Sequence, residues 1–350
     1  MKVVANIEYT KVQRIGVGQG MNSEVYLADD PQLGGRIAVK EIAKANFGNN
    51  VAAFFAEAQT MFSAAHDNVV PVQYACATKD HVCIAMPYYA AGSLQDRIDA
   101  QPLSMAEVIR VGDAVLNGLA QIHMNSFIHF DVKPSNVLFG RHDTPLVADF
   151  GQSRRIGPKG IVQVPPLYFH IMPPECMLGG VGSSACDIYQ AGILLYRCVN
   201  GDPFFKQQVP NTDAELQART VAGTYPDRDS FLPHVPLRLR KLIRKALEVA
   251  PQDRYQSATE MADDLAQVPV GLNWSVAHAG ASTTWTAARG QAPGYEVVMA
   301  EKGGRHEVRV HTVASDGSRR AKGKDDLWAA DLRRQRALTH LRRVFRALEG

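Results

Sequence analysis

Residues 129–151, HFDVKPSNVLFGRHDTPLVADFG, carry the strongest signal for the fold. This stretch contains two polar motifs, with Asp131, Lys133 and Asn136 in the first and Asp149 in the second. The apolar residues between the motifs are interrupted by glycine and proline, which predicts a short hairpin. The order and spacing of the two motifs, more than either motif alone, indicate a function.

A glycine-rich turn stands near the N-terminus, in the sequence GQGMNSEV of residues 18–25. Gly18 and Gly20 allow the backbone to approach phosphate oxygens, and Val25 offers an apolar surface for a base. Ser23 occupies the position where a third glycine is expected. Because glycine-rich hairpins are common turns, this signal is weak by itself.

A single lysine ends the apolar run IAVK at residues 37–40. Lys40 is either a surface cation or a phosphate ligand. Glu57 follows in residues 50–65, which are rich in good helix formers, and its carboxylate could pair with Lys40 and fix the ammonium group. On its own, a glutamate in such a helix is more often a solvated residue.

Together these elements resemble the eukaryotic-like (Hanks-type) serine/threonine protein kinases, in the form that many bacteria carry. Pro173-Pro174-Glu175 resembles the family's Ala-Pro-Glu element. Asp187 resembles the aspartate that ties down the catalytic loop, and Arg254 resembles the partner of Glu175. The resemblance covers about three quarters of the chain. It implies an α+β, bilobal protein-kinase fold, with a small β-rich N-lobe, a mainly helical C-lobe and a small α+β C-terminal domain.

The resemblance also implies a reaction, the ATP- and Mg²⁺-dependent transfer of a γ-phosphate to Ser or Thr hydroxyls of a protein substrate. Asp131 would orient the substrate hydroxyl and accept its proton, and Lys133 would stabilise the transferring phosphate. Asn136 and Asp149 would hold magnesium, a hard cation that prefers oxygen ligands. The nucleotide-binding residues implied are Val17, Gly18, Gly20, Ser23, Val25, Ala38, Lys40, Glu57, Met86, Pro87, Tyr88, Tyr89 and Leu138.

The composition is that of an ordinary globular protein, with 46% hydrophobic and 21% charged residues. This excludes a disordered, fibrous or disulfide-stapled class. No apolar run approaches the roughly 20 residues of a membrane-spanning helix, and residues 1–10 lack a signal pattern, so we expect a cytoplasmic protein without membrane contact. The five cysteines include no CxxC pair, which favours buried reduced thiols over a metal site.

The secondary-structure pattern divides the chain into three parts. Strands are expected over residues 9–15, 24–28, 36–42, 69–74 and 82–86, with the helix at 50–65. Helices are expected over residues 106–124, 184–199, 237–248 and 258–267. Further strands are expected over residues 274–279, 283–288, 295–300 and 305–313, then a loop at 315–324 and a helix at 326–348. We predict a kinase N-lobe at residues 1–86, a C-lobe at 87–269 and a basic accessory domain at 270–350.

Two departures from the family pattern bear on regulation. Phe130 replaces the arginine that normally pairs with a phosphorylated activation loop. Ser153 and Tyr168 are the only hydroxyl residues between Gly151 and Glu175. We therefore predict that activity does not require phosphorylation of this loop. The alternative is a pseudokinase-like nucleotide-binding scaffold, against which the complete polar set of the site argues.

The C-terminal residues are basic. Residues 271–350 hold 14 Lys and Arg against 8 Asp and Glu, a net charge of +6 that leaves −3 on the rest of the chain. In the expected last helix, Leu338, Leu341, Phe345 and Leu348 form an apolar stripe, which is ordinarily core. The alternative is a basic face, joined by the tryptophans at 274, 285 and 328, that captures an acidic protein or a nucleic acid.

Overall fold

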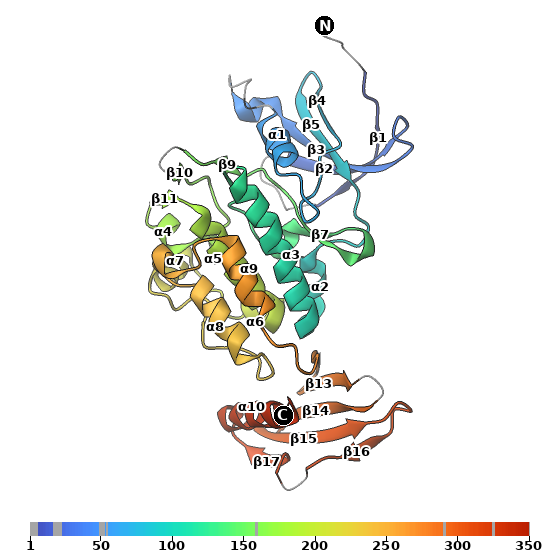
Figure 1. The fold of residues 1–350 in the computed structure, drawn as a ribbon, viewed down its shortest axis with the longest axis vertical. Helices are drawn as coiled ribbons and strands as arrows, with labels where there is room; N and C mark the ends of the chain where they lie inside the picture. The colour runs from blue at the N-terminus through green and yellow to red at the C-terminus, as the bar shows by residue number, and fades with distance from the viewer. Residues whose placement is uncertain are drawn as a thin grey trace.

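The computed structural model shows an α+β protein with three parts along its long axis: a sheet with one helix, a helical part, and a second sheet with one helix (Figure 1). The predicted nucleotide-binding residues Val17, Gly18 and Gly20 lie outside the residues that the structure describes. Those described are 6–16, 23–48, 53, 55–157, 160–289, 292–323 and 326–349.

The N-terminal part is an antiparallel sheet of five strands in the order β1-β2-β3-β5-β4. Its strands are β1 (Thr10–Ile15), β2 (Ser23–Asp30), β3 (Gly35–Ala43), β4 (Tyr74–Ala77) and β5 (His81–Pro87). β3 is the middle strand, and it is buried from Ile37 to Ile42. The register places Val25 opposite Lys40 and Ala38 opposite Met86, so three strands contribute neighbouring residues.

Two expectations for this part need revision. The helix expected over residues 50–65 is shorter where it is described, because α1 spans Ala56–Ser63 and Ala64 is its C-cap. The strand expected over residues 69–74 is wrong, since β4 begins only at Tyr74. Pro71 has no N–H group for a strand ladder. Val70 instead donates to the carbonyl of Val147 at 2.9 Å, which pins this stretch to the helical part.

The helical part is built around two long helices, α3 (Met105–Met124) and α5 (Ser184–Asn200). α3 begins at a capping box formed by Ser104 and Glu107. α5 is buried on all sides from Cys186 onward, so it forms the centre of the core. The other helices are α2 (Leu94–Ala100), α4 (Pro174–Met177), α6 (Asp202–Lys206), α7 (Asp213–Val221), α8 (Leu237–Ala246) and α9 (Ala258–Ala266).

Short antiparallel strand pairs lie in the segments that connect these helices. β6 (Phe127–Ile128) pairs with β9 (Arg154–Arg155), β7 (Val137–Phe139) pairs with β8 (Pro145–Val147), and β10 (Val162–Gln163) pairs with β11 (Val181–Gly182). The β7–β8 pair is the hairpin expected between the two polar motifs. Single 3-10 turns lie at Lys44–Phe47, Pro134–Asn136, Arg141–Asp143, Phe169–Ile171 and Pro251–Asp253.

The C-terminal part is a second antiparallel sheet covered by one helix. Its elements are β12 (Ser275–Ala279), β13 (Ser282–Arg289), β14 (Ala292–Lys302), β15 (Arg305–Val313), β16 (Arg319–Ala321), β17 (Ala329–Leu332) and α10 (Arg334–Glu349). Leu341 and Phe345 of α10 pack with Trp274 and Trp285, which are fully buried. The apolar stripe of α10 is therefore core, and these two tryptophans do not form a binding surface.

The helix expected over residues 326–348 is wrong at its start, and the loop expected at 315–324 contains β16. Leu332 pairs with His306 and Ala329 with Val308, so this segment forms β17 on the edge of β15. Asp331 has a φ of 55°, which an α-helix does not accept. Tertiary pairing thus replaces the first turns of the expected helix.

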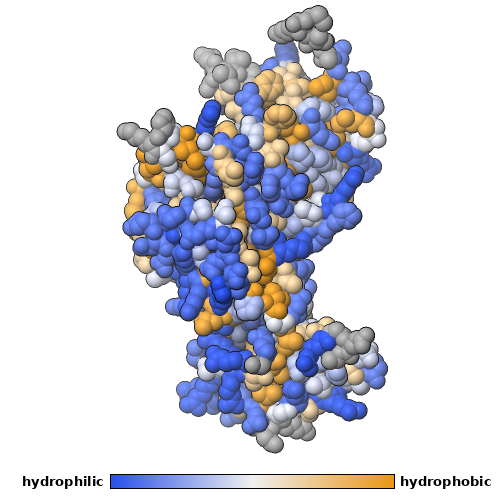
Figure 2. Space-filling model, viewed as in Figure 1, coloured by the Kyte–Doolittle hydropathy of each residue, from blue (hydrophilic) through white to orange (hydrophobic). Residues whose placement is uncertain are grey.

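The C-terminal sheet contacts the helical part through buried groups. Leu232, before α8, packs against the hydrophobic cores of both parts. Trp285 donates from Nε1 to Nδ1 of the buried His234 at 3.1 Å. Hydrophilic residues cover most of the visible face of both parts in Figure 2. Among the described residues, no helix is both long and apolar enough to span a bilayer.

Candidate active site

Lys40 lies at the centre of two ion pairs. Its Nζ is 2.6 Å from Oε1 of Glu57 and 2.7 Å from Oδ1 of Asp149. β3 carries the lysine, α1 carries the glutamate, and Asp149 follows β8. The three residues therefore join the N-terminal sheet, its helix and the helical part at one point.

The charges of these three groups are set by burial and by each other. Burial acts against the charge on Lys40, but the carboxylates of Asp149 and Glu57 outweigh it and raise the pKa of Lys40. Burial also acts to raise the pKa of Asp149, yet the ammonium of Lys40 lowers it to about 2. At Glu57 burial prevails and raises the pKa. Asp149 is thus ionised at neutral pH.

Asp131 is held by two side chains of its own loop. Lys133 donates from Nζ to Oδ2 of Asp131 at 2.7 Å, and Asn136 donates from Nδ2 to the same oxygen at 2.8 Å. Within the described part of the chain, no side chain hydrogen-bonds to the other oxygen, Oδ1. This oxygen is therefore available to a substrate hydroxyl.

Helix α5 fastens the loop that carries Asp131. Asp187 accepts from the N–H groups of His129 and Phe130, both at 2.8 Å. Gln190 accepts from the N–H of Val132 at 2.9 Å and donates to the carbonyl of Phe130 at 2.8 Å. The family resemblance implied this role for Asp187, whereas Gln190 was not predicted. Its only signal was a polar side chain three residues after Asp187, and therefore on the same face of the helix.

Two oxygen groups fit a magnesium ion. Asn136 uses its amide nitrogen on Asp131, so its amide oxygen remains as a ligand. The N–H of Ala148 donates to the carbonyl of Asn136 at 2.8 Å, so the hairpin brings Asn136 beside the segment that carries Asp149. An amide oxygen and an ionised carboxylate are ligands that suit Mg²⁺.

Apart from Glu57 on α1, the described residues predicted to contact the nucleotide come from four strands and one connection. Val25, Ala38 and Met86 lie on β2, β3 and β5, which are adjacent in the sheet. Leu138 lies on β7, and it packs with Met86 against the main hydrophobic core. Ser23 begins β2.

The connection between the two parts carries the remaining predicted contacts. Pro87 ends β5, and Tyr88 and Tyr89 follow it, all three partly buried. Burial raises the pKa of the Tyr89 hydroxyl. The structure therefore brings the described members of the predicted set to the junction of the sheet and the helical part.

Phe130 anchors the activation segment, which runs from Gly151 to α4. It is fully buried, has a φ of 65°, and shares a small apolar cluster with Ile128 and two cysteines. Gly182 of β11 lies against its ring, where a β-carbon would stand 2.3 Å from Cζ. The segment residues that pack on this cluster are Ile156, Val162, Val164, Leu167 and Met172.

The far end of the segment is held by an ion pair. Arg254, fully buried, donates from Nη1 and Nη2 to the two oxygens of Glu175 at 2.8 and 2.7 Å. Closer to the reaction centre, the Nζ of Lys133 lies 5.5 Å from the ring centroid of Tyr168. Tyr168 is also hydrogen-bonded to His170 at 3.0 Å. These contacts hold the segment beside Asp131.

Residues 9–265 match the family model of the protein kinase domain. The chain therefore belongs to the protein kinase family. Within that family it is of the bacterial Hanks type, because its curated relatives are bacterial serine/threonine kinases. Members of the family generally use ATP and Mg²⁺.

Three relatives illustrate the similarity. The chain is 29% identical to serine/threonine-protein kinase PrkC of Bacillus subtilis over 257 residues, which are 71% of this chain and 39% of that protein. It is 27% identical to the probable serine/threonine-protein kinase PknB of Lactococcus lactis, over 71% of this chain and 40% of that protein. It is also 27% identical to serine/threonine-protein kinase PknD of Chlamydia felis, over 72% and 30%. The chain thus spans less than half the length of these relatives.

Proposed function

We propose that this chain transfers the γ-phosphate of ATP to Ser or Thr hydroxyls of a protein substrate, in a reaction that needs Mg²⁺. The observation that supports this most is the pairing of Lys40 with both Glu57 and Asp149. Asp131 lies in the adjoining loop with one carboxylate oxygen free of side-chain partners among the described residues. Phosphoryl transfer depends mainly on positioning and charge neutralisation, which such a site supplies.

Each polar residue has a role in this proposal. Lys40 binds the phosphates, and Glu57 holds its ammonium in place. Asn136 and Asp149 hold Mg²⁺, which when bound offsets the charge of the transferring group. Asp131 orients the substrate hydroxyl and accepts its proton, and Lys133 stabilises the phosphate in transit. Lys133, two residues after Asp131, is also the reason for preferring Ser and Thr over Tyr.

The nucleotide base is assigned to the junction of the sheet and the helical part. Val25, Ala38 and Leu138 supply apolar surface to adenine, and Met86 borders the pocket behind it. The backbone at residues 87–89 hydrogen-bonds the adenine ring. The glycine-rich turn, with Val17, Gly18, Gly20 and Ser23, covers the phosphates.

The kinase assignment is tested with the purified chain, labelled ATP and Mg²⁺. An Asp131→Asn variant keeps the shape of the side chain and should label a protein substrate at least about a hundredfold more slowly, because the proton acceptor is lost. Asp113→Asn on the exposed face of α3 is the matched control and should match the wild type. Equal, negligible labelling by all three proteins would favour the nucleotide-binding scaffold instead.

We further propose that activity does not depend on phosphorylation of the activation loop. In kinases that need it, a phosphate pairs with the arginine before the catalytic aspartate. Here Phe130 stands at that position, and the loop packs on it through apolar side chains. The antiparallel pairing of Val162 with Gly182 adds a second attachment. Apolar burial thus replaces the charge pair as the force that orders the loop.

Mass spectrometry of the loop and treatment with a phosphatase test this second proposal. We expect full activity after phosphatase treatment and no change in an Ser153→Ala variant. Activity that disappears on treatment and returns with phosphorylation of Ser153 or Tyr168 would contradict it.

We propose that the chain consists of a kinase N-lobe (1–86), a C-lobe (87–269) and an accessory domain (270–350), and that the protein is cytoplasmic. We also propose that the accessory domain recruits an acidic protein partner. The positive charges of Arg342 and Arg346 of α10 act on Arg240 of α8. Burial, followed by the charge of Arg342, lowers the pKa of Arg240 to about 10. Nε of Arg342 is buried without a partner among the described residues. This group of arginines on α8 and α10 favours the binding of an anion.

Charge reversal tests the recruitment proposal. The pair Arg342→Glu and Arg346→Glu should weaken binding of an acidic protein substrate at least tenfold and leave phosphorylation of a short peptide unchanged. Arg334→Glu with Arg336→Glu, on the exposed start of α10, is the matched control. Binding of single-stranded nucleic acid by the wild type, with no binding of acidic protein, would decide for the nucleic-acid partner.

A further inference from the structure

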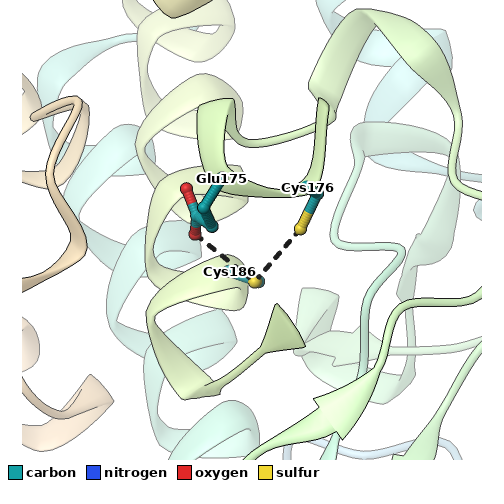
Figure 3. A group of neighbouring side chains, drawn as sticks. All are labelled: Glu175, Cys176 and Cys186. Atoms are coloured by element: carbon teal, nitrogen blue, oxygen red, sulfur yellow. Dashed lines mark hydrogen bonds between the residues drawn. The ribbon is translucent and has the colours of Figure 1, made fainter. Parts of the chain in front are cut away.

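Two cysteines face each other at the end of the activation segment. Sγ of Cys176 in α4 lies 3.5 Å from Sγ of Cys186 in the first turn of α5 (Figure 3). Cys176 is 9% exposed, and Cys186 is fully buried. Glu175 completes the group, with Oε1 at 3.5 Å from Sγ of Cys186. Neither sulfur has a role in the proposed reaction.

This group does not suit a metal ion. Its three potential ligands are one fewer than a structural zinc site uses. Both oxygens of Glu175 are already bound by the guanidinium of Arg254, which is fully buried. A divalent cation at this place would lie beside that buried positive charge. The two thiols are therefore left as the reactive feature of the group.

We propose that Cys176 and Cys186 are a modification site, a thiol pair that forms a reversible disulfide when the protein meets a peroxide. The sulfur atoms must approach from 3.5 Å to about 2.05 Å. α4 is a single turn of four residues, so it can supply this movement, whereas α5 is a long helix fixed in the core. In a reducing compartment such a bond is transient, as in redox sensors.

The order of the chemical steps follows from exposure. Cys176 is the more exposed thiol, so it reaches the oxidant first. It loses its proton, the thiolate attacks one peroxide oxygen and the O–O bond breaks. A sulfenic acid forms, and the departing hydroxide takes up the thiol's proton and leaves as water. Cys186 then attacks the sulfur of this sulfenic acid, the S–S bond forms, and a second water leaves. The departing hydroxide takes up the proton of Cys186, which Glu175 relays from its place 3.5 Å from Sγ of Cys186, and so leaves as this water. The two thiols lose two electrons in total, and the peroxide takes them up.

The bond would act on the activation segment. Both cysteines belong to the apolar cluster of Phe130, the residue directly before Asp131. Cys176 also adjoins Glu175, so a shift of α4 pulls on the ion pair with Arg254. The disulfide therefore changes the packing under the catalytic loop without touching any residue of the proposed catalytic machinery.

Peptide mapping of the full chain tests the bond directly. Trypsin leaves both cysteines in one peptide, residues 160–197, which contains no other cysteine. After hydrogen peroxide and alkylation, we expect this peptide to be two hydrogens lighter and unalkylated, and dithiothreitol should restore two alkylation sites. A peptide that still takes up two alkyl groups would overturn the proposal. So would bond formation that is no faster in the native protein than in the guanidinium-unfolded chain.

Single variants separate the two thiols. In Cys186→Ala, Cys176 should stop at the sulfenic acid, which a cyclic 1,3-dione labels. Cys198→Ser, which removes another fully buried thiol, is the matched control and should form the bond as the wild type does. Thermal unfolding of each reduced variant checks that it is folded. Absence of dione labelling in a folded Cys186→Ala protein would contradict the assignment of Cys176 as the first thiol.

Activity gives a separate readout that rests on the proposed function. We expect oxidation to lower substrate phosphorylation by the wild type several-fold, reversibly, and not to affect Cys186→Ala. No activity in the reduced sample would count against the kinase proposal and not against the bond. A linked protein with unchanged activity would overturn the effect on the activation segment.

Discussion

Gly182 and Phe130 are in direct contact, and the contact leaves no room for a β-carbon. A methyl group at Gly182 would stand 2.3 Å from Cζ and 2.6 Å from Cε1 of the phenyl ring. Phe130 directly precedes Asp131, and the glycine lies on β11, beyond α4, where it pairs with Val162 of the activation segment. One residue without a side chain thus sets how closely the segment approaches the catalytic loop.

Gly182→Ala should therefore lower the free energy of unfolding by about 1–3 kcal/mol, because a rigid buried ring must move. Denaturant titration measures this. Gly35→Ala is the control, since a β-carbon there meets open space. Adding Phe130→Leu to the Gly182→Ala protein should recover part of the loss. Equal stability of the two alanine variants would contradict the tight contact.

Glu57→Gln should lower kcat/KM for ATP by roughly 10- to 100-fold, since Lys40 loses one of its two carboxylates and is drawn toward Asp149. Steady-state kinetics with varied ATP measures the effect. Glu260→Gln removes a surface carboxylate that pairs with Lys245 at 2.9 Å, and it should leave kcat/KM unchanged. An unchanged value in Glu57→Gln as well would remove Glu57 from the site.

The lowered pKa of Asp149 predicts that the protein loses stability in acid. Its pKa is lowered from 3.8 to about 2 in the folded protein, so its contribution is complete above about pH 4 and disappears as the pH falls toward 2. We expect a contribution of about 1–2 kcal/mol, reduced by screening because a third of the side chain is exposed. The difference in unfolding free energy between the wild type and Asp149→Asn should shrink over this range. A constant difference would contradict the lowered pKa.

The lowered pKa of His234 predicts a second effect of pH on stability, at a higher pH than that of Asp149. Burial lowers its pKa from 6.5 to about 3, so the unfolded chain binds a proton between these values and the folded chain does not. Stability should fall by up to about 1.4 kcal/mol per pH unit as the pH drops below about 6. His234→Asn keeps an acceptor for Trp285 and should remove this slope. His66→Asn, at an exposed position, should retain it.

Much of the helical part could be predicted from the sequence because its periodicity is strong. The expected helix over residues 106–124 differs by one residue from α3, and the one over 184–199 by one residue from α5. The strand expected at residues 69–74 failed because Pro71 cannot join a ladder. The segment before α10 failed because β17 exists only through its pairing with β15, and strand preference depends on such neighbours.

The candidate site was predictable as a set of residues and not as an arrangement. Motif spacing identified Lys40 and Asp149, but their contact spans 109 residues of sequence and depends on how the two parts meet. The absence of arginine at Phe130 was visible in the sequence. Its replacement by an apolar contact with Gly182 was not, because no local pattern marks that glycine. Gln190 was missed because its partners are backbone groups of a distant loop.

Leu232 has a consequence for how the whole molecule melts. The partly buried side chain packs against two hydrophobic cores at once, and His234, two residues further on, accepts a hydrogen bond from Trp285 of the C-terminal sheet. Unfolding of the C-terminal sheet would expose Leu232 and His234 to water and remove apolar contacts from the loop before α8. The C-terminal part and the helical part should therefore unfold in a single calorimetric transition on heating. The basic C-terminal part thus stabilises the part of the protein that carries Asp131.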